Sequence, residues 1–240
     1  MTIARQDVTR PGTAEASAEF RRRLLDGMIA AIRERGFREL TVADVVRQAR
    51  TSRRTFYEHF ASKQDCFIAL LREANAAMVR QIAAAVDPRV LWHIQVRQAI
   101  EAWIASAQSE PAVTLSWIRE VPALGDDARQ LQRESLEAFI VLIQALTDTA
   151  ELRAVGIVPP PRQFAVILLG GLRELIATTV EDGGDIGDIT EVAVRATVAL
   201  LGPRKDAPSA GAPSAGAPSA GAPSASAPNT GARSKDSAGS

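Results

Sequence analysis

The chain has 240 residues, of which 46% are hydrophobic and 23% charged, and its formal net charge is zero. This content of apolar residues suits one or two domains with a substantial core and excludes disorder for most of the chain. No apolar run reaches the roughly 18 residues that span a bilayer. The amino terminus lacks the pattern of a signal peptide. We therefore expect a cytoplasmic protein with no membrane partner.

The cysteine content narrows the chemistry further. Cys66 is the one cysteine, so the chain forms no internal disulfide and no cysteine-based zinc cluster. We expect Cys66 to be a small buried apolar side chain, with a redox sensor as the alternative. No metal site and no cofactor are predicted.

The zero net charge hides an asymmetry along the chain. Residues 1–80 carry 15 Lys and Arg against 10 Asp and Glu, a net charge of +5. Residues 81–201 carry 9 against 16, a net charge of −7. A basic front end on an acidic body is what binding of DNA at one end of the molecule requires.

The first 40 residues predict an arm followed by a helix. Residues 1–14 have no apolar periodicity, which indicates a mobile arm; Arg5 and Arg10 could touch DNA, or the arm is an ordinary frayed terminus. Residues 16–35 repeat apolar side chains at intervals of four, which predicts a helix. Gly36 stands where a helix-ending glycine belongs.

The segment TVADVVRQARTSRRTFYEHFASK, residues 41–63, predicts two short helices joined by a tight turn. Thr41 and Asp44 have the spacing of a capping box, in which each residue satisfies a free backbone N–H of the other. We expect the two helices to cover residues 42–48 and 53–59. A further helix should begin near the end of the segment.

The second of these helices has two different faces. Phe56 and Phe60 are four residues apart and share the inner face. Arg53, Arg54 and Tyr57 fall largely on the faces left over. A short helix of this kind, preceded by another short helix, suits a helix-turn-helix, whose second helix enters the major groove of DNA.

The remaining chain has helical periodicity and no sustained strand alternation. We expect helices at about residues 63–86, 90–108, 112–119, 126–154, 163–180 and 188–201. After Gly202 the unit APSAG occurs three times and then decays, a composition that cannot bury a core. The predicted fold class is all-α, organised as a mobile arm (1–14), a three-helix helix-turn-helix DNA-binding domain (15–62), a helical body (63–202) and a disordered tail (203–240).

The stretch TVADVV…TSRRTFYEHFASKQDCF resembles the DNA-binding segment of the TetR family of transcriptional regulators, and T-F-Y-x-H-F-x-S-K is its specific part. The resemblance covers about residues 23–71. In the turn the family commonly has Gly and then an apolar residue, where this chain has Arg50 and Thr51. A non-Gly residue in left-handed conformation costs roughly 1 kcal/mol. The resemblance implies that the body, residues 63–202, is a helical effector-binding and dimerisation domain, since the family has a larger helical domain that dimerises and often encloses a small ligand.

The resemblance and the motif together give the candidate DNA contacts. The residues implied to contact the phosphate backbone are Thr41, Tyr57, His59 and Lys63. Those at the front of the second helix, which we expect to read base edges, are Ser52, Arg53, Arg54 and Thr55. An arginine can bind both acceptors on the major-groove edge of guanine. The alternative for the two arginines is a solvated basic face.

Aromatic side chains of the body, and one arginine beside them, are candidates for lining an apolar ligand pocket. They are Trp92, Trp103, Trp117, Arg119, Phe139 and Phe164. The alternative for each aromatic residue is a place in the ordinary core, and for Arg119 a surface salt bridge.

The last two predicted helices carry more apolar side chains than a monomer of this size needs to cover one side of its core. Gly170 and Gly171 lie in the middle of a helix, where each costs roughly 1 kcal/mol. Close approach of another helix accounts for them; a kink or close packing within the chain are the alternatives. The resemblance implies a four-helix dimer interface. The candidate interface residues are Leu169, Gly170, Leu172, Ile176, Val194 and Val198.

These features predict a homodimeric, sequence-specific transcriptional regulator of a palindromic double-stranded DNA operator, a repressor released by a small apolar effector. One alternative is a dimeric DNA-binding regulator without an effector. Another is a helical enzyme, although the sequence has no recognisable catalytic motif and only two histidines. We therefore predict no enzymatic activity and no catalytic residues.

Overall fold

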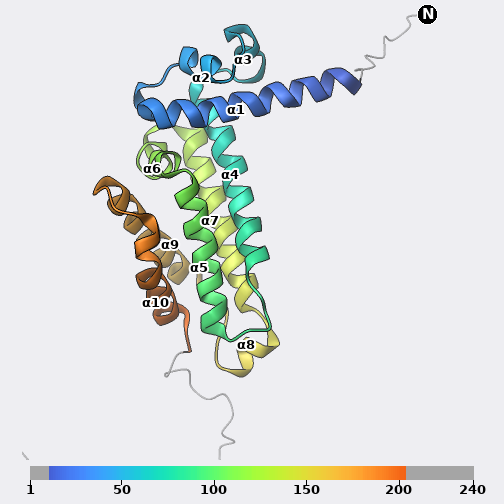
Figure 1. Ribbon diagram of the computed structural model, residues 1–240. Helices are drawn as coiled ribbons and strands as arrows, with labels where there is room; N and C mark the ends of the chain where they lie inside the picture. Colours follow the sequence, from blue (N-terminus) through green and yellow to red (C-terminus); the bar gives the residue numbers. More distant parts are fainter. Residues whose placement is uncertain (1–10, 204–240) are drawn as a thin grey trace, which may run out of the picture. The chain divides into compact units, whose positions relative to one another are not determined.

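The computed structural model describes residues 11–203, and every regular element in them is helical (Figure 1). The predicted all-α class is confirmed. The predicted tail from residue 204 onward and the first ten residues of the predicted arm lie outside the described residues. The helices are α1 (Pro11–Glu39), α2 (Val42–Gln48), α3 (Arg53–His59), α4 (Lys63–Ala85), α5 (Trp92–Ser109), α6 (Pro111–Arg119), η1 (Val121–Ala123), α7 (Asp126–Thr147), α8 (Ala150–Ala154), α9 (Arg162–Glu181), η2 (Ile186–Ile189) and α10 (Thr190–Leu201).

The first helix differs from its prediction at its start. α1 begins at Pro11, within the predicted arm. Gly36 leaves the helical conformation, with φ 74° and ψ 157°, and a short helical turn to Glu39 follows across this kink. Only glycine adopts such a conformation at little cost, and it interrupts the helix at the predicted position.

The predicted helix over residues 126–154 is in fact two helices, α7 and α8. Asp148 leaves the helical conformation, with φ −95° and ψ 57°. Thr149 then caps α8, because its hydroxyl oxygen accepts a hydrogen bond from the backbone N–H of Leu152 at 3.2 Å. A threonine side chain can thus replace a helical hydrogen bond to a backbone N–H. Apolar periodicity alone does not reveal such a break.

α1 and α2 cross in close contact at Gly27. A Cβ atom at this position would lie 2.7 Å from the carbonyl oxygen of Val45 and 2.9 Å from the Cβ of Ala49. Any side chain at position 27 would therefore push α2 away from α1. Glycine inside a helix costs about 1 kcal/mol, and the close crossing offsets this cost.

A first core joins the predicted DNA-binding domain to the start of the body. Phe56 of α3 and Phe67 of α4 are fully buried in it, and Phe37 stacks on Phe67 with ring centroids 4.2 Å apart. Leu131 of α7 belongs to the same core, which thus continues across the boundary predicted at residues 62 and 63. Cys66 is buried here as predicted, and burial raises the pKa of its thiol to about 12.

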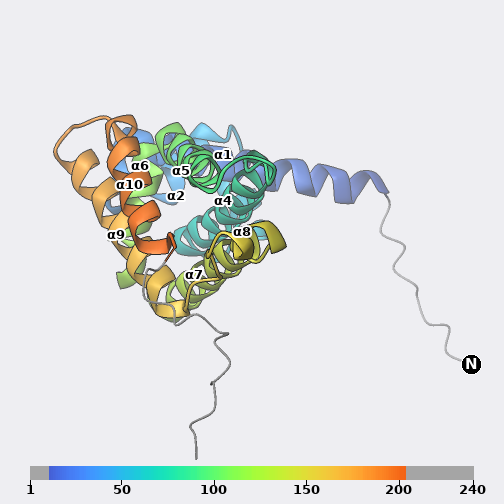
Figure 2. The same ribbon diagram turned by 90° about the horizontal axis from the view of Figure 1, so that it is seen from below.

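A second core fills the body among α4, α5, α7, α9 and α10 (Figure 2). One prediction needs correction here, because α9 has a mean hydropathy of 1.4 and is long and apolar enough to cross a bilayer. Only 28% of its most apolar 18-residue window is buried within the chain. Leu168, Leu172 and Ile176 face the second core, whereas Ile167 on the other side is 63% exposed. α9 is thus a core helix with a second, uncovered apolar side.

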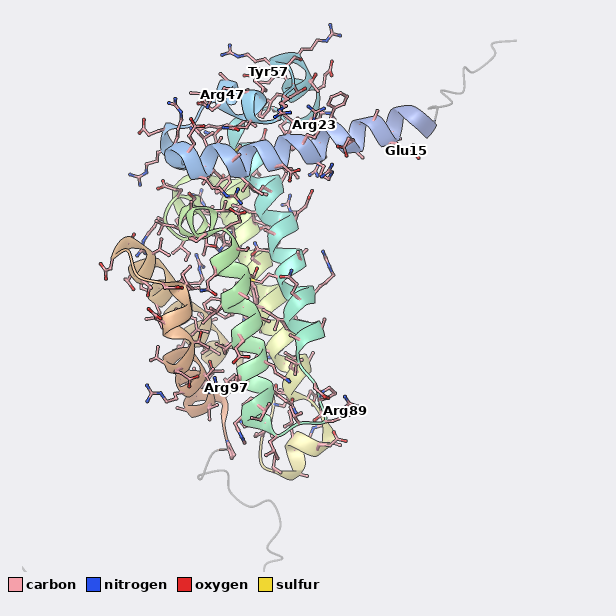
Figure 3. The ribbon with its side chains drawn as sticks, in the orientation of Figure 1. Glu15, Arg23, Arg47, Tyr57, Arg89 and Arg97 are labelled. Carbon is pink, nitrogen blue, oxygen red and sulfur yellow. The ribbon has the colours of Figure 1, made fainter. Side chains whose placement is uncertain are left out.

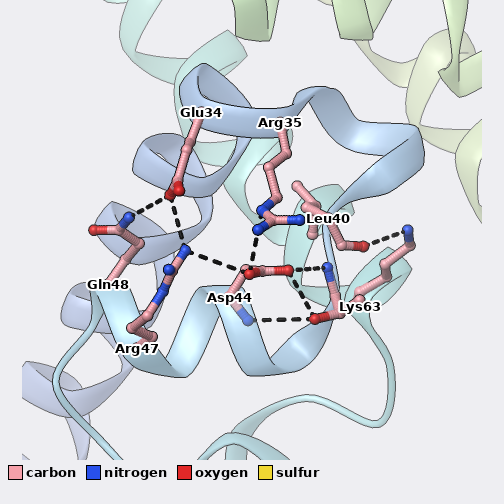
Figure 4. A network of polar contacts seen from close by, with 8 residues as sticks. Glu34, Arg35, Leu40, Asp44, Arg47, Gln48 and Lys63 are labelled. Atoms are coloured by element: carbon pink, nitrogen blue, oxygen red, sulfur yellow. Dashed lines mark hydrogen bonds and ion pairs between the residues drawn. The ribbon is translucent and has the colours of Figure 1, made fainter.

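Lys63, the first residue of α4, ties down the carboxyl end of α1 (Figure 4). Its ammonium group donates hydrogen bonds to the carbonyl oxygens of Phe37, Arg38 and Leu40 at 3.1, 3.1 and 2.8 Å. It also lies 5.0 Å from the centre of the Phe37 ring. Carbonyl groups at a helix end lack partners within the helix, and this one side chain supplies three donors for them. Its predicted phosphate contact stays a prediction.

Replacing Lys63 with Met keeps the aliphatic stem and removes these charged hydrogen bonds. We expect the free energy of unfolding to fall by about 2 kcal/mol. For a domain of this size the melting temperature should fall by roughly 4–8 °C, measured by circular dichroism. Arg53→Met, at an exposed position, is the control and should leave the melting temperature unchanged. A stable Lys63→Met variant that lost DNA affinity would contradict the structural link and favour phosphate contact.

Candidate DNA-binding surface and effector cavities

The turn after α2 is a Schellman motif in which Arg50 stands where glycine is usual. The Thr51 N–H donates to the carbonyl oxygen of Val46 at 3.0 Å, and the Arg50 N–H donates to that of Arg47 at 3.2 Å. These are the two hydrogen bonds that define the motif. Arg50 has a φ of 49°, the left-handed conformation considered for it from the sequence.

Arg23 of α1 stabilises this turn through hydrogen bonds (Figure 3). Its guanidinium group donates hydrogen bonds to the carbonyl oxygens of Ala49 at 2.6 Å and Arg50 at 2.7 Å. Helix α1 thereby fixes the backbone between the end of α2 and the start of α3. Sequence reasoning missed Arg23, because nothing in the local pattern distinguishes it from the two arginines before it.

The predicted capping box at the start of α2 is confirmed (Figure 4). The backbone N–H of Thr41 donates to Asp44 at 2.9 Å, and the N–H of Asp44 donates to the Thr41 hydroxyl at 3.4 Å. Hydrogen bonds from the Thr41 side chain and backbone, with Arg35 and Arg47 nearby, lower the pKa of the Asp44 carboxyl. The Thr41 hydroxyl is thus engaged in its own cap, although the residue stays exposed.

α3 presents a basic and aromatic outer face. Arg53 is exposed, the side chain of Arg54 is 90% exposed and Tyr57 is 58% exposed. Figure 3 places Tyr57 on the side of α1 that faces away from the helical body. The inner face buries Phe56 completely, as predicted. The structure thus brings three of the predicted DNA contacts together on one accessible surface.

The other predicted contacts lie at the edges of this face. The Ser52 hydroxyl caps α3 by accepting a hydrogen bond from the Thr55 N–H at 3.0 Å. Thr55 and His59 are half-buried. Glu58 was not predicted; its carboxylate accepts a hydrogen bond from the Arg54 Nε at 3.0 Å and fixes one side of that guanidinium group.

Comparison with known proteins bears on this arrangement. The sequence model described as "Bacterial regulatory proteins, tetR family" matches residues 24–70, which comprise most of α1 and all of α2 and α3. Residues 24–70 therefore carry a tetR-family DNA-binding domain. The predicted resemblance to a TetR-family transcriptional regulator and the predicted helix-turn-helix fold are confirmed. No curated protein matches it at the level of sequence.

Solved structures of several regulators resemble this chain over most of its length. FadR from Bacillus halodurans, a fatty acid degradation regulator, has 16% identity and a TM-score of 0.64, covering 76% of this chain and 99% of its own. FadR from Bacillus subtilis, solved with stearoyl-CoA, has 16% identity and a TM-score of 0.64, with 75% and 97% covered. A TetR-family regulator from Streptomyces coelicolor has 20% identity and a TM-score of 0.57, with 80% and 95% covered. At these identities the likeness is one of fold.

The body of the regulator contains two neighbouring cavities. The first, the apolar cavity, has a volume of about 90 Å³ and is bordered by side chains that include Trp92, Val96, Trp103, Phe139, Leu146 and Leu201. The second, the arginine cavity, has a volume of about 100 Å³, and its lining includes Asn75, Trp103, Trp117, Ser135, Phe139 and Arg173. Each is several times the roughly 10–15 Å³ that one water needs. Trp103, Phe139 and Leu169 line both.

Two predicted ligand residues do not line these cavities. Arg119 makes ion pairs with Glu174 at 2.8 Å and Glu181 at 2.7 Å, and so braces α6 against α9. This is the surface salt bridge weighed as its alternative. Phe164 also lies outside both linings. The other four predicted aromatic residues line one cavity or both.

Most of the predicted dimer residues pack within the chain, and their place in an interface stays a prediction. Leu172, Ile176 and Val194 are buried in the second core of the chain itself, and Leu172 also borders a groove between α9 and α10. Leu169 lines both cavities, and Val198 packs partly buried against the second core. The apolar periodicity marked the inner face of each helix and could not distinguish it from an interface. Of the six, Gly170 alone is exposed.

An uncovered apolar groove lies between α9 and α10. This α9–α10 groove has a volume of about 540 Å³, and its lining includes Ile167, Gly171, Leu175, Val192, Ala196 and Ala199. A Cβ atom at Gly170 or Gly171 would meet nothing within 4 Å. α9 runs through both glycines without interruption. Neither a kink nor close packing within the chain therefore accounts for the pair.

Replacing Arg50 with Gly tests the strain in the turn. Because glycine adopts left-handed dihedrals freely, we expect the free energy of unfolding to rise by about 0.5–1 kcal/mol in chemical denaturation. Arg50→Ala is the matched control, since it also removes the charged side chain but keeps the strain. Equal stability of the Gly and Ala variants would show that the turn is not strained.

Proposed function

We propose that this regulator is a homodimeric repressor in the cytoplasm that binds a palindromic DNA operator and releases it when a small molecule enters the body. The observation that carries the proposal is the outer face of α3, where Arg53, Arg54 and Tyr57 are exposed on a helix braced from behind. That face has the length and chemistry of a recognition helix that enters the major groove. The family match supports the same conclusion.

The proposed DNA contacts fall into two groups, those that read base edges and those that bind the phosphate backbone. Arg53 and Arg54 would read base edges together with Ser52 and Thr55, since arginine pairs with two acceptors of guanine. Glu58 holds Arg54 and adds a second base reader, because a carboxylate can accept a hydrogen bond from cytosine N4. The phosphate contacts would come from Thr41, Tyr57, His59 and Lys63. The Lys63 ammonium is occupied by carbonyl groups, so its contact would use the free N–H groups at the start of α4.

Selection of bound sequences from a random duplex pool tests this function. We expect a palindromic consensus whose affinity falls steeply with salt, because phosphate contacts release counterions. Arg54→Ala should weaken binding to the consensus by about 1–3 kcal/mol and relax the preference at one position of each half-site. Arg162→Ala, exposed on α9, is the control and should bind like the wild type. No enriched sequence and no salt dependence would refute the proposal.

The α9–α10 groove supports the dimer. Ile167 is 63% and Val192 42% exposed, and both lie beside the open surface at Gly170 and Gly171. Small residues allow two helices to approach closely, and burial of this surface against its twofold mate would stabilise a dimer. The second copy would also cover the apolar side of α9.

A charge placed in the groove tests the dimer. Ala196→Arg should convert the protein to a monomer of 25.6 kDa in size-exclusion chromatography with light scattering, because it buries an unpaired charge. Ala105→Arg introduces the same change at an exposed position of α5, outside the groove, and should leave the dimer intact. A dimeric Ala196→Arg variant would place the interface elsewhere.

α6 offers a route from the cavities to the DNA-binding helices. Trp117 and Ile118 of α6 line the arginine cavity. At its ends, Glu110 pairs with Arg33 of α1, and Glu120 pairs with Arg38 at 2.7 Å. A ligand that moved α6 or α4 would thereby move α1 and change the spacing of the two recognition helices. Release requires only that the ligand bind the mismatched form better than the operator-bound form.

A further inference from the structure

Arg173 is a charged side chain with no hydrogen-bond or ion-pair partner in the described part of the chain. Its Nε atom is buried with no hydrogen-bond acceptor, and no ion pair of its guanidinium group is found within residues 11–203. The adjacent carboxylate, Glu174, is engaged by Arg119. Two weaker interactions remain for Arg173: the Trp117 ring, whose centre lies 5.7 Å away, and the charge of Glu174, with which it forms no ion pair. Burial lowers the pKa of Arg173, the expected effect of removing a cation from water.

The lining of the arginine cavity contains no counter-charge for Arg173. No Asp or Glu lines the arginine cavity. Its other polar groups are neutral: the Asn75 side-chain amide donates to the Ser135 hydroxyl at 2.7 Å, and Gln132 lies beside them. An unpaired buried cation is costly, whereas a bound anion forms strong charge-assisted hydrogen bonds with guanidinium. The cavity is therefore suited to an anionic group.

The adjoining apolar cavity is suited to hydrocarbon. Three of its polar side chains already donate hydrogen bonds to backbone carbonyl oxygens. The Gln95 amide donates to Val90 at 2.8 Å, and the hydroxyls of Thr147 and Thr197 each donate to the preceding turn of their own helix at 2.8 Å. The Trp92 Nε1 is buried and without a partner among the described residues. Everything else in its lining is apolar. Trp103 and Phe139 border both cavities, so the two spaces are neighbours. An elongated molecule that displaced these two side chains would extend from Arg173 into the apolar cavity.

We infer that the effector is an amphiphilic carboxylic acid of medium chain length, with its carboxylate on Arg173 and its apolar chain in the apolar cavity. This inference rests on the proposed effector-released repressor and names the chemical class of its ligand. A neutral apolar molecule would leave the Arg173 charge unpaired. Arg173 is thus the residue that selects acids.

Titration with octanoate and octanamide tests the inference. The two ligands share chain length and differ in charge, and quenching of Trp103 and Trp117 fluorescence reports binding. We expect octanoate to bind the full chain at least roughly tenfold more tightly than octanamide. Equal affinities would overturn the inference without any mutation. Tighter binding of octanoyl-CoA than of octanoate would also overturn it, since the thioester carries no charge at the acyl end.

Matched variants assign the preference to one side chain. Arg173→Gln should abolish the preference for octanoate, and Arg173→Lys, which keeps the charge, should retain most of it. Arg162→Gln changes an exposed arginine of the same helix and should behave like the wild type. A preference that survives in Arg173→Gln, folded by circular dichroism, would overturn the assignment.

Operator binding separates this inference from the proposed function. Octanoate should release wild-type protein from its selected operator at concentrations that saturate the fluorescence change. Binding of octanoate with unchanged operator affinity would refute effector release while the carboxylate site stood. Intact operator binding without any preference for the acid would refute the carboxylate site alone.

Discussion

The DNA-binding end depends on the packing of α3, a helix of seven residues that is too short to be stable alone. Isolated helices shorter than roughly 12–15 residues are marginal in water, so α3 takes its position from its neighbours. α1 supplies most of the support: Gly27 allows α2 to approach, and Arg23 holds the turn. Lys63 secures the far end of α1 to α4. The orientation of the exposed arginines follows from these contacts.

The sequence predicted the local structure of this end well. Capping residues and short-range periodicity gave α2 and α3 with their observed bounds, and the T-F-Y-x-H-F-x-S-K pattern gave the family. What it could not give were contacts between residues far apart in the chain. Arg23 and Lys63 look like surface cations in the sequence, and only the fold brings backbone carbonyl groups within their reach.

The body was harder to predict, for a different physical reason. A buried helix face and a dimer face are both apolar, so periodicity located the inner side of α9 and assigned it to the interface. Gly170 and Gly171 indicated the proposed interface better. Each destabilises the helix, and no described part of the chain packs closely enough against them to require glycine. Arg173 was missed because a charged residue in an apolar helix is ordinarily a surface residue, and only its surroundings reveal an unpaired charge. α6 then links that charge to α1 through Glu110 and Glu120.

The burial of Cys66 has a practical consequence for measuring the proposed movement. It is the one thiol of the chain, and burial keeps it protonated and shielded from reagents. A cysteine introduced at an exposed position of α3 would therefore be the single site that accepts a spin label. In a symmetric dimer the two labels would report one distance between the recognition helices. Pulsed electron resonance could then follow that distance as a ligand is added, without a native background signal.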